Sequence, residues 1–156
     1  MASKIEAFDQ SAAPQTNDTL LEGLNDREYS IVYIEDNESN LRLVESLFDK
    51  YSNLKLFTAK EGVAGIALCE KVIPDLILLD INLPGEDGFK ILEKLRQIKD
   101  LKEKPIVAVS ANAMEHDIVK GLEHGFDGYV VKPINLSMLL ETVKRQLSKS
   151  TDSGGL

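Results

Sequence analysis

The sequence lacks the features that mark exported and membrane-bound proteins. It holds one cysteine, Cys69, among 156 residues, which excludes an internal disulfide and is typical of a reducing compartment. No stretch approaches the roughly 18 consecutive apolar residues of a membrane-spanning helix, and the N-terminal region carries no apolar run of the signal-peptide type. We therefore expect a cytoplasmic protein that does not insert into a membrane.

Basic residues are too few for a nucleic-acid surface. The 18 Lys and Arg residues are outnumbered by 26 Asp and Glu residues, and the net charge is −8. Half of this excess lies in residues 1–29, where 2 basic residues accompany 6 acidic ones. Phosphate backbones are bound by clustered lysine and arginine. Since the sequence has no such stripe, we predict no direct binding of nucleic acid.

Length and composition indicate one globular domain with loose ends. The apolar share of 43% and the charged share of 28% are ordinary for a folded chain of this size. Residues 1–29 mix small polar residues and acids with few large apolar side chains, which predicts a flexible acidic leader or linker. Residues 149–156 end in Ser-Gly-Gly-Leu and predict a flexible tail. The domain itself is expected over residues 30–148.

Within this domain, short apolar runs alternate with helical patterns. The runs, which we predict to be strands, lie at residues 30–35, 55–58, 75–80, 105–110 and 128–131. After each run, apolar residues recur at intervals of three and four, as they do on one face of a helix. Five βα units in succession predict an α/β fold of three layers, a doubly wound parallel sheet with helices on both faces.

Charged and polar side chains follow the predicted strands at their carboxyl ends. In an open parallel sheet, ligands bind beyond these ends. The residues placed there are Glu35 and Asp36, Asp80, Ser110 and Lys132. Three carboxylates at one edge repel one another unless a cation compensates them. Mg²⁺ prefers oxygen ligands and is commonly held by one or two carboxylates, so we predict a Mg²⁺ site, with Mn²⁺ as a possible substitute.

A carboxylate beside such a cation can attack phosphorus and form an aspartyl phosphate. Lys132 can place its charge on one phosphoryl oxygen, and Ser110 can donate a hydrogen bond to another. Asn82, two residues after Asp80, can offer its backbone carbonyl to the metal. Pro133 follows Lys132 and can take a cis peptide bond at low cost, which would aim the ammonium toward the site.

These residues resemble the receiver domains of two-component response regulators and of hybrid histidine kinases. The resemblance spans roughly residues 30–148. Its motifs are Glu35-Asp36-Asn37, the run Leu78-Leu79-Asp80-Ile81-Asn82-Leu83-Pro84-Gly85, Ser110-Ala111, and Tyr129-Val130-Val131-Lys132-Pro133. The resemblance implies a flavodoxin-like fold with strand order 2-1-3-4-5. It also implies a phosphorelay signalling domain that catalyses only its own phosphorylation and dephosphorylation.

The resemblance assigns the metal site and the phosphoacceptor. It implies that Asp80 accepts the phosphoryl group and that Asp36 and Asp80 bind Mg²⁺ directly. Asn82 would contribute its backbone carbonyl, and Glu35 would act through a metal-bound water. The first acid of the pair is commonly Asp in this family. The Glu35 form is similar to receivers attached to hybrid kinases, which leaves the ligand shell of Glu35 open.

The resemblance also implies a switch and its partners. Ser110 and Lys132 would bind the phosphoryl group, and Tyr129 would change rotamer together with Ser110. The donor would be a histidine kinase or a histidine phosphotransfer protein. An unknown downstream protein would bind the face of the fourth helix, fifth strand and fifth helix, and dimerisation on phosphorylation is compatible with the family. As an alternative, the chain is the receiver segment of a hybrid kinase that passes phosphate to a histidine phosphotransfer protein.

Simpler interpretations of single residues stay open. Asp36 and Asn37 could only cap the first helix, and Asp80 could only end a strand in a turn. Tyr129 could only pack on an edge strand. Asp87 is a candidate helix cap, and two other titratable residues, His116 and His124, are expected to be exposed rather than metal ligands.

Three function classes remain to compare. A receiver fold with vestigial phosphorylation is disfavoured because every expected site position is filled. A flavodoxin-like electron carrier would have its flavin phosphate repelled by Glu35 and Asp36. An aspartate-based phosphatase would need a second Asp where the chain has Asn82, and no Gly-x-x-x-x-Gly-Lys loop for a nucleotide is present. The phosphoacceptor switch accounts best for the sequence.

Overall fold

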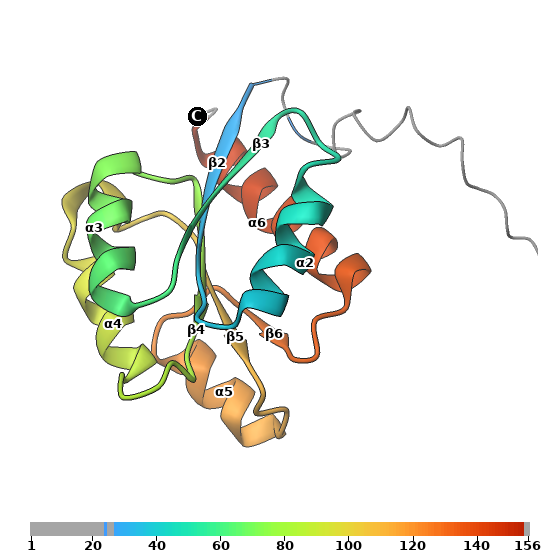
Figure 1. The fold of residues 1–156 in the computed structure, drawn as a ribbon. Helices are drawn as coiled ribbons and strands as arrows, with labels where there is room; N and C mark the ends of the chain where they lie inside the picture. The colour runs from blue at the N-terminus through green and yellow to red at the C-terminus, as the bar shows by residue number, and fades with distance from the viewer. Residues whose placement is uncertain (1–23, 25–26, 155–156) are drawn as a thin grey trace, which may run out of the picture.

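In the part of the chain that the structure describes, five strands and five helices alternate (Figure 1). The computed structural model describes Leu24 and residues 27–154, with side chains to residue 149. The elements are β2 (Tyr29–Ile34), α2 (Glu38–Phe48), β3 (Leu54–Ala59), α3 (Gly62–Val72), β4 (Leu76–Asp80), α4 (Gly88–Arg96), the short 3₁₀ helix η1 (Lys99–Leu101), β5 (Ile106–Ser110), α5 (Glu115–Glu123), β6 (Gly128–Val131) and α6 (Leu136–Gly154).

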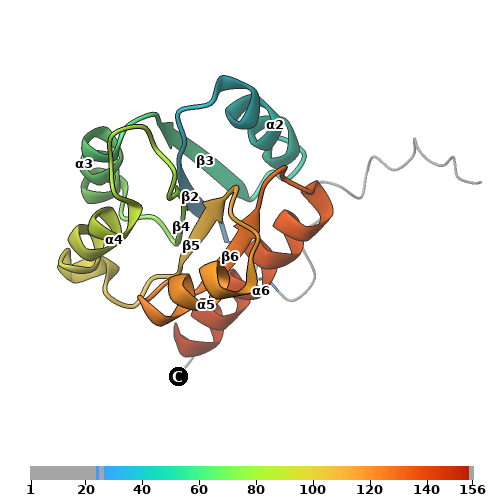
Figure 2. The ribbon, with the colours of Figure 1, turned by 90° about the horizontal axis from the view of Figure 1, so that it is seen from below.

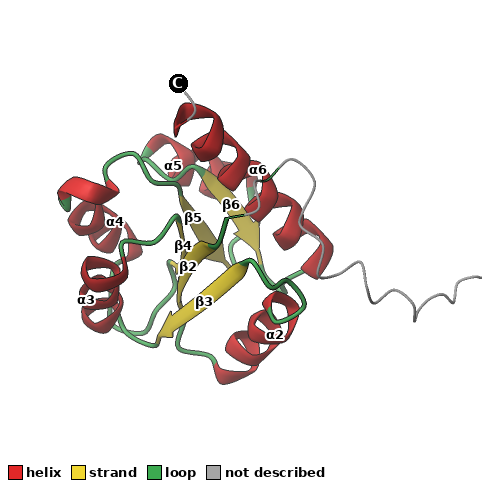
Figure 3. Ribbon diagram, turned by 90° about the horizontal axis from the view of Figure 1, so that it is seen from above, coloured by secondary structure: helices red, strands yellow, loops and turns green. Residues whose placement is uncertain are grey.

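The strands form one parallel sheet in the order β3-β2-β4-β5-β6. Counted along the chain, this is the order 2-1-3-4-5, and the predicted fold is confirmed. Because all strands run the same way, their carboxyl ends meet at one edge of the sheet. Figure 2 looks onto this edge from below, and Figure 3 looks onto the opposite edge from above.

Helices cover both faces of the sheet and enclose two apolar cores. Helices α2 and α6 lie on one face, and α3, α4 and α5 lie on the other (Figures 2 and 3). The central strands β4 and β5 are buried along their whole length, as strands covered on both faces must be. The core under α2 and α6 includes Val44 and Val143, and the core under α3 and α4 includes Cys69 and Leu92.

Helices α2 and α3 approach the sheet in different ways. Helix α2 presents large side chains at helical spacing, among them Leu41, Val44 and Phe48. Helix α3 instead turns small residues toward the sheet, and an ideal Cβ at Gly65 would lie 2.4 Å from Ile34 Cδ1. The absence of a side chain at Gly65 therefore brings α3 close to the end of β2, where the acidic residues follow.

The start of the domain lies slightly earlier than the sequence predicts. Tyr29, which we assigned to the leader, is fully buried as the first residue of β2, and its N–H donates to Asn53 O at 2.7 Å. Arg27 lies over the Tyr29 ring at 4.0 Å and pairs with Asp75 at 3.1 Å. The chain is thus anchored before the first strand. The rest of the predicted leader, apart from Leu24, Arg27 and Glu28, lies outside the described residues.

Helix α6 extends past the predicted end of the domain. It runs to Gly154 rather than ending near residue 148, so most of the expected tail is helical backbone. No proline or glycine interrupts the sequence between Leu147 and Gly154, and the helix has no reason to end earlier. Among the helices that the structure describes, none combines the length and apolar character needed to cross a membrane.

Candidate functional site

Three carboxylates meet at the carboxyl edge of the sheet. One oxygen from each of Glu35, Asp36 and Asp80 lies within 4.8 Å of the others. Asp80 ends β4, and the two other acids follow the neighbouring strand β2. Glu35 and Asp80 are 0% and 1% exposed, whereas Asp36 is exposed. Two of the three charges are therefore removed from water, which is costly unless cationic groups approach them.

Lys132 is the cation that approaches them. Its Nζ lies 3.0 Å from Asp80 Oδ2 and 3.1 Å from Glu35 Oε1. Burial alone would lower the pKa of Lys132, but its hydrogen bonds and charge attraction to the two carboxylates outweigh burial and raise the pKa. Lys132 directly follows β6, and its peptide bond to Pro133 is cis.

Glu35 is held by its own strand and by the start of α2. Tyr33 Oη donates to Glu35 Oε1 at 2.7 Å, and the N–H of Asn37 donates to Oε2 at 3.2 Å. Burial raises the pKa of Glu35, the neighbouring Asp80 carboxylate raises it further, and the Tyr33 and Lys132 contacts oppose this. Burial also raises the pKa of the Tyr33 hydroxyl. The donors around Glu35 therefore compensate its charge only in part.

Asn82 links the phosphoacceptor candidate to Ser110. The N–H of Asn82 donates to Asp80 Oδ1 at 2.8 Å. Its side-chain Oδ1 accepts from Ser110 Oγ at 3.0 Å and from the N–H of Ala111 at 3.1 Å. Ser110 Oγ in turn accepts from the N–H of Asn112 at 3.0 Å. The hydrogen-bond partners of the Ser110 hydroxyl thus lie in the loops after β4 and β5 rather than among the carboxylates.

Tyr129 lies apart from the acidic cluster, between β6 and α5. The residue is half-buried, and its hydroxyl donates to Asn112 O at 3.0 Å. An ideal Cβ at Gly121 of α5 would lie 3.0 Å from Tyr129 Cε2, so the ring fills the space under this helix. Tyr129 reaches the Ser110 region through Asn112, which contacts both side chains.

Two residues close to the acidic cluster in sequence, Asn37 and Asp87, are helix caps. The Asn37 side chain caps α2 by accepting from Asn40 N–H at 2.9 Å, and Asp87 caps α4 by accepting from Phe89 N–H at 2.9 Å. Asp36 precedes the cap of α2 rather than forming it. His116 and His124 are exposed, as expected.

The structure brings together most of the residues that the sequence singled out, and it adds two contacts. The hydroxyl of Tyr33 was missed, although strand alternation places it on the same face as Glu35. The side-chain role of Asn82 was also missed, since only its backbone carbonyl was considered. No sequence signal could reveal the second contact, because Ser110 lies on another strand.

The donor set suits a hard divalent cation. Three carboxylates and one ammonium leave a net negative charge at the edge, and the exposed Asp36 leaves a side open to water. Mg²⁺ retains several waters and binds carboxylate oxygens. The residues present therefore fit such an ion.

Comparisons with known proteins identify the family of this chain. A family model described as the response regulator receiver domain matches residues 31–144. The polar-differentiation response regulator DivK of Brucella ovis is 33% identical over 118 residues, which cover 76% of this chain and 95% of DivK.

Two solved structures extend the comparison. The chemotaxis response regulator CheY4 of Vibrio cholerae superposes with a TM-score of 0.69 at 27% identity, covering 76% of this chain and 98% of CheY4. The receiver domain of the sensor histidine kinase PA1611 of Pseudomonas aeruginosa gives a TM-score of 0.69 at 26% identity, covering 77% and 98%. That protein carries a magnesium ion coordinated in its active-site cleft. With the matching fold and acidic edge, the chain belongs to the receiver domain family of two-component response regulators.

Proposed function

We propose that this domain is a phosphoacceptor switch in which Asp80 receives a phosphoryl group from a phosphohistidine donor, a histidine kinase or a histidine phosphotransfer protein. One observation carries the proposal. The Asp80 carboxylate is buried, with Lys132 on one oxygen and the Asn82 N–H on the other, in a cluster with two further carboxylates. A carboxylate held beside an ammonium and a candidate cation site can act as a nucleophile toward phosphorus.

The transfer step follows from these contacts. An Asp80 oxygen attacks phosphorus while the P–N bond to the donor imidazole breaks, and the bonding electron pair stays on that nitrogen. Lys132 neutralises charge on the transferred group, and Ser110 donates a hydrogen bond to it. A Mg²⁺ ion held by Asp36, Asp80 and the Asn82 carbonyl, with Glu35 acting through water, would supply the positive charge that three phosphoryl oxygens require.

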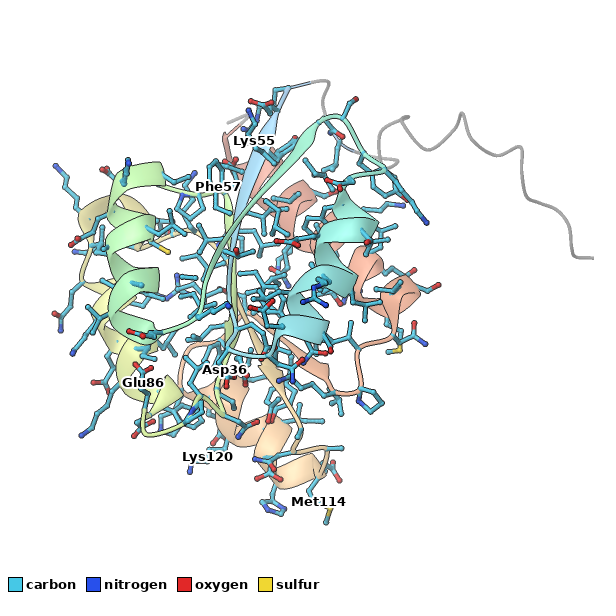
Figure 4. The ribbon with its side chains drawn as sticks, viewed as in Figure 1. Asp36, Lys55, Phe57, Glu86, Met114 and Lys120 are labelled. Atoms are coloured by element: carbon cyan, nitrogen blue, oxygen red, sulfur yellow. The ribbon has the colours of Figure 1, made fainter. Side chains whose placement is uncertain are left out.

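The switch would start at Ser110. To donate to a phosphoryl oxygen, the Ser110 hydroxyl has to leave Asn82 Oδ1. We infer that Tyr129, which is joined to the same loop through Asn112, then turns into the space that Ser110 vacates, and that α5 shifts. A downstream protein would read this change on the face of α5, β6 and α6. The exposed side chains of Met114, Val119 and Leu122 give this face its apolar character (Figure 4 labels Met114).

The alternative, a receiver segment of a hybrid kinase, is favoured by one residue. Glu35 replaces the more common Asp, and the PA1611 receiver belongs to a sensor histidine kinase. In that case residues 1–29 would link the receiver to a preceding domain, and Asp80 would pass its phosphoryl group to a histidine phosphotransfer protein. Transfer from phosphorylated chain to such a protein, measured beside transfer in the forward direction, separates the two functions.

The proposal is tested by labelling with a small-molecule phosphodonor and Mg²⁺. The wild-type chain should gain one base-labile phosphoryl group on Asp80, detected by intact mass and peptide mapping. Asp80→Asn should gain none, because an amide is not a nucleophile toward phosphorus. Asp87→Asn is the matched control, since Asp87 lies in the same loop but caps α4, and it should label as the wild type does. Labelling of Asp80→Asn at the wild-type rate would refute the assignment.

A further inference from the structure

The loop between β4 and α4 is fastened to a neighbouring helix through Glu86. Both carboxylate oxygens of Glu86 lie 3.0 Å from the N–H of Gly62, the first residue of α3. Glu61 holds the N-cap position of α3 but forms no capping hydrogen bond with its own side chain. The amino end of α3 is therefore capped from another element, by the loop that follows Asp80.

Glu86 and the amino end of α3 at Gly62 are complementary in charge and in shape. The first turn of α3 contains no acidic residue, so Glu86 supplies the negative charge that a helix amino end favours. An ideal Cβ at position 62 would lie 2.2 Å from Glu86 Oε1 and 2.7 Å from Ile91 Cδ1. Only glycine at position 62 leaves room for the Glu86 carboxylate at this distance.

Glu86 is connected to the site through a short hydrogen-bonded turn. Its N–H donates to Leu83 O at 3.2 Å, which closes a turn that contains Gly85 at a φ of 70°. Leu83 is 3% exposed and packs in the core, and the residue before it is Asn82, whose N–H binds Asp80. A displacement at Glu86 would therefore move the backbone that carries Asn82.

The segment just before α3 also contacts the start of α2, which follows the other two carboxylates. Lys60, two residues before Gly62, pairs with Glu38 at the start of α2, just after Asp36. The amino end of α3 and the residues just before it thus contact the loop after β4 and the start of α2, although they contribute no side chain to the cluster. Figure 4 shows Asp36 and Glu86 at the same end of the molecule.

We propose that Glu86 is a positioning residue for the divalent cation site. By binding the amino end of α3, it holds the Asn82 carbonyl at the spacing from Asp36 and Asp80 that the cation requires. Mg²⁺ demands near-ideal octahedral geometry, so a loop free to shift would lose affinity. This inference rests on the proposed function, because it assumes a cation bound by those three residues.

The test compares Mg²⁺ affinities of the unphosphorylated full chain, measured by NMR titration of backbone amides. The matched control is Glu61→Ala, which removes one exposed negative charge beside Gly62 without breaking a contact to the loop. Glu86→Ala should weaken Mg²⁺ binding about tenfold, the lower end for outer-shell partners of metal sites. Glu61→Ala should weaken it less than about twofold, because its charge acts only through screened solvent. Glu86→Gln, which retains one acceptor oxygen, should lie between them.

A second readout needs no metal. In Glu86→Ala, the amide resonances of Asn82 and Leu83 should shift and the Gly62 amide should exchange faster with solvent. In Glu61→Ala, the resonances of Asn82 and Leu83 should stay in place, and only amides next to the substituted residue should shift. Gly62→Ala should reproduce the Mg²⁺ defect, since its Cβ displaces the Glu86 carboxylate. If Glu86→Ala does not fold, Glu86→Gln and Gly62→Ala carry the comparison.

Two outcomes would overturn the role of Glu86 without affecting the proposed function. The first is that Glu86→Ala and Glu61→Ala weaken Mg²⁺ binding equally, which would reveal an effect of charge alone. The second is that Glu86→Ala binds Mg²⁺ with the same affinity as the wild type. Absence of Mg²⁺ binding in the wild type would be a different result. It would remove the proposed cation site itself, and the positioning role of Glu86 with it.

Discussion

At the scale of residues, the charge of Glu35 is the one that its surroundings compensate only in part. The carboxylate is fully buried, and its donors are Tyr33, Lys132, Asn37 and a longer contact from Asn40. Burial and the adjacent Asp80 raise its pKa above the ordinary value of 4.5. The folded state therefore binds a proton on Glu35 more tightly than the unfolded state does. The corresponding stabilisation is complete at acid pH and is lost as the pH rises from 4.5 through the folded pKa.

Tyr33→Phe tests this balance. Removing the hydroxyl leaves Glu35 Oε1 without its shortest hydrogen bond, so the free energy of unfolding should fall by about 1–3 kcal/mol at pH 7. The hydroxyl lowers the Glu35 pKa, so the loss should be smaller at pH 4, where Glu35 is protonated. Urea denaturation in the presence of a chelator measures both values.

Tyr51→Phe is the matched control for that measurement. Tyr51 is a half-buried tyrosine whose pKa is raised by burial alone. The fall in the free energy of unfolding caused by Tyr51→Phe should be small and independent of pH between 4 and 7. An equal loss at both pH values in Tyr33→Phe would show that Glu35 is not the group that responds.

At the scale of elements, helix α3 packs close to the sheet because Gly65, which has no side chain, faces β2. The Cβ that alanine would add at position 65 meets three atoms of Ile34, the nearest at 2.4 Å. Ile34 is the last residue of β2 and is fully buried, directly before Glu35. The position of α3 therefore bears on the position of the acidic pair as well as on the core.

Gly65→Ala should destabilise the protein even though alanine is the better helix former. Helix propensity favours alanine by about 1 kcal/mol, whereas forcing an extra methyl group against Ile34 costs about 1–3 kcal/mol. We expect a net fall in thermal midpoint. Ala67→Gly, at an exposed position of the same helix, reports propensity alone and should lower stability by about 1 kcal/mol. A higher thermal midpoint for Gly65→Ala would show that the close packing of α3 is not limiting.

At the scale of the whole molecule, the sheet collects charges from distant parts of the chain at one edge. Lys132 lies 97 residues from Glu35 and 52 residues from Asp80, yet it contacts both. At the opposite edge of the sheet, Asp75 forms ion pairs with two cations, Arg27 and Lys104. The site edge thus carries excess negative charge that the fold tolerates, and a bound cation should stabilise the fold as a whole.

Mg²⁺ should therefore raise the stability of the wild-type chain. A ligand that binds only the folded state adds about 2.7 kcal/mol at one hundred times its dissociation constant. Asp36→Ala should abolish this response, while its metal-free stability should equal or exceed that of the wild type because one repelling charge is gone. Thermal denaturation with Mg²⁺ or a chelator, at equal ionic strength, measures both effects. A full Mg²⁺ response in Asp36→Ala would exclude this residue as a ligand.

Much of the fold and site was predictable from local patterns. The alternation of apolar runs with helical spacing determines the strands and helices, and parallel strands necessarily bring Asp36, Asp80 and Ser110 to one edge. The limits of the domain were less certain. Tyr29 was placed outside the first strand, because no proline or glycine marks that boundary. Helix α6 was ended too early, although the first glycine after Leu147 is Gly154.

What the sequence by itself determined is the chemistry available at the edge of the sheet: three carboxylates, an ammonium and a hydroxyl at the ends of successive strands. Only the tertiary structure decided how these groups are oriented. The Tyr33 bond to Glu35, the Asn82 bond to Ser110 and the Glu86 cap on α3 each depend on how the side chains are oriented in the folded molecule. Two of the three join elements that are remote along the chain, and such contacts form only after the sheet has brought the elements together.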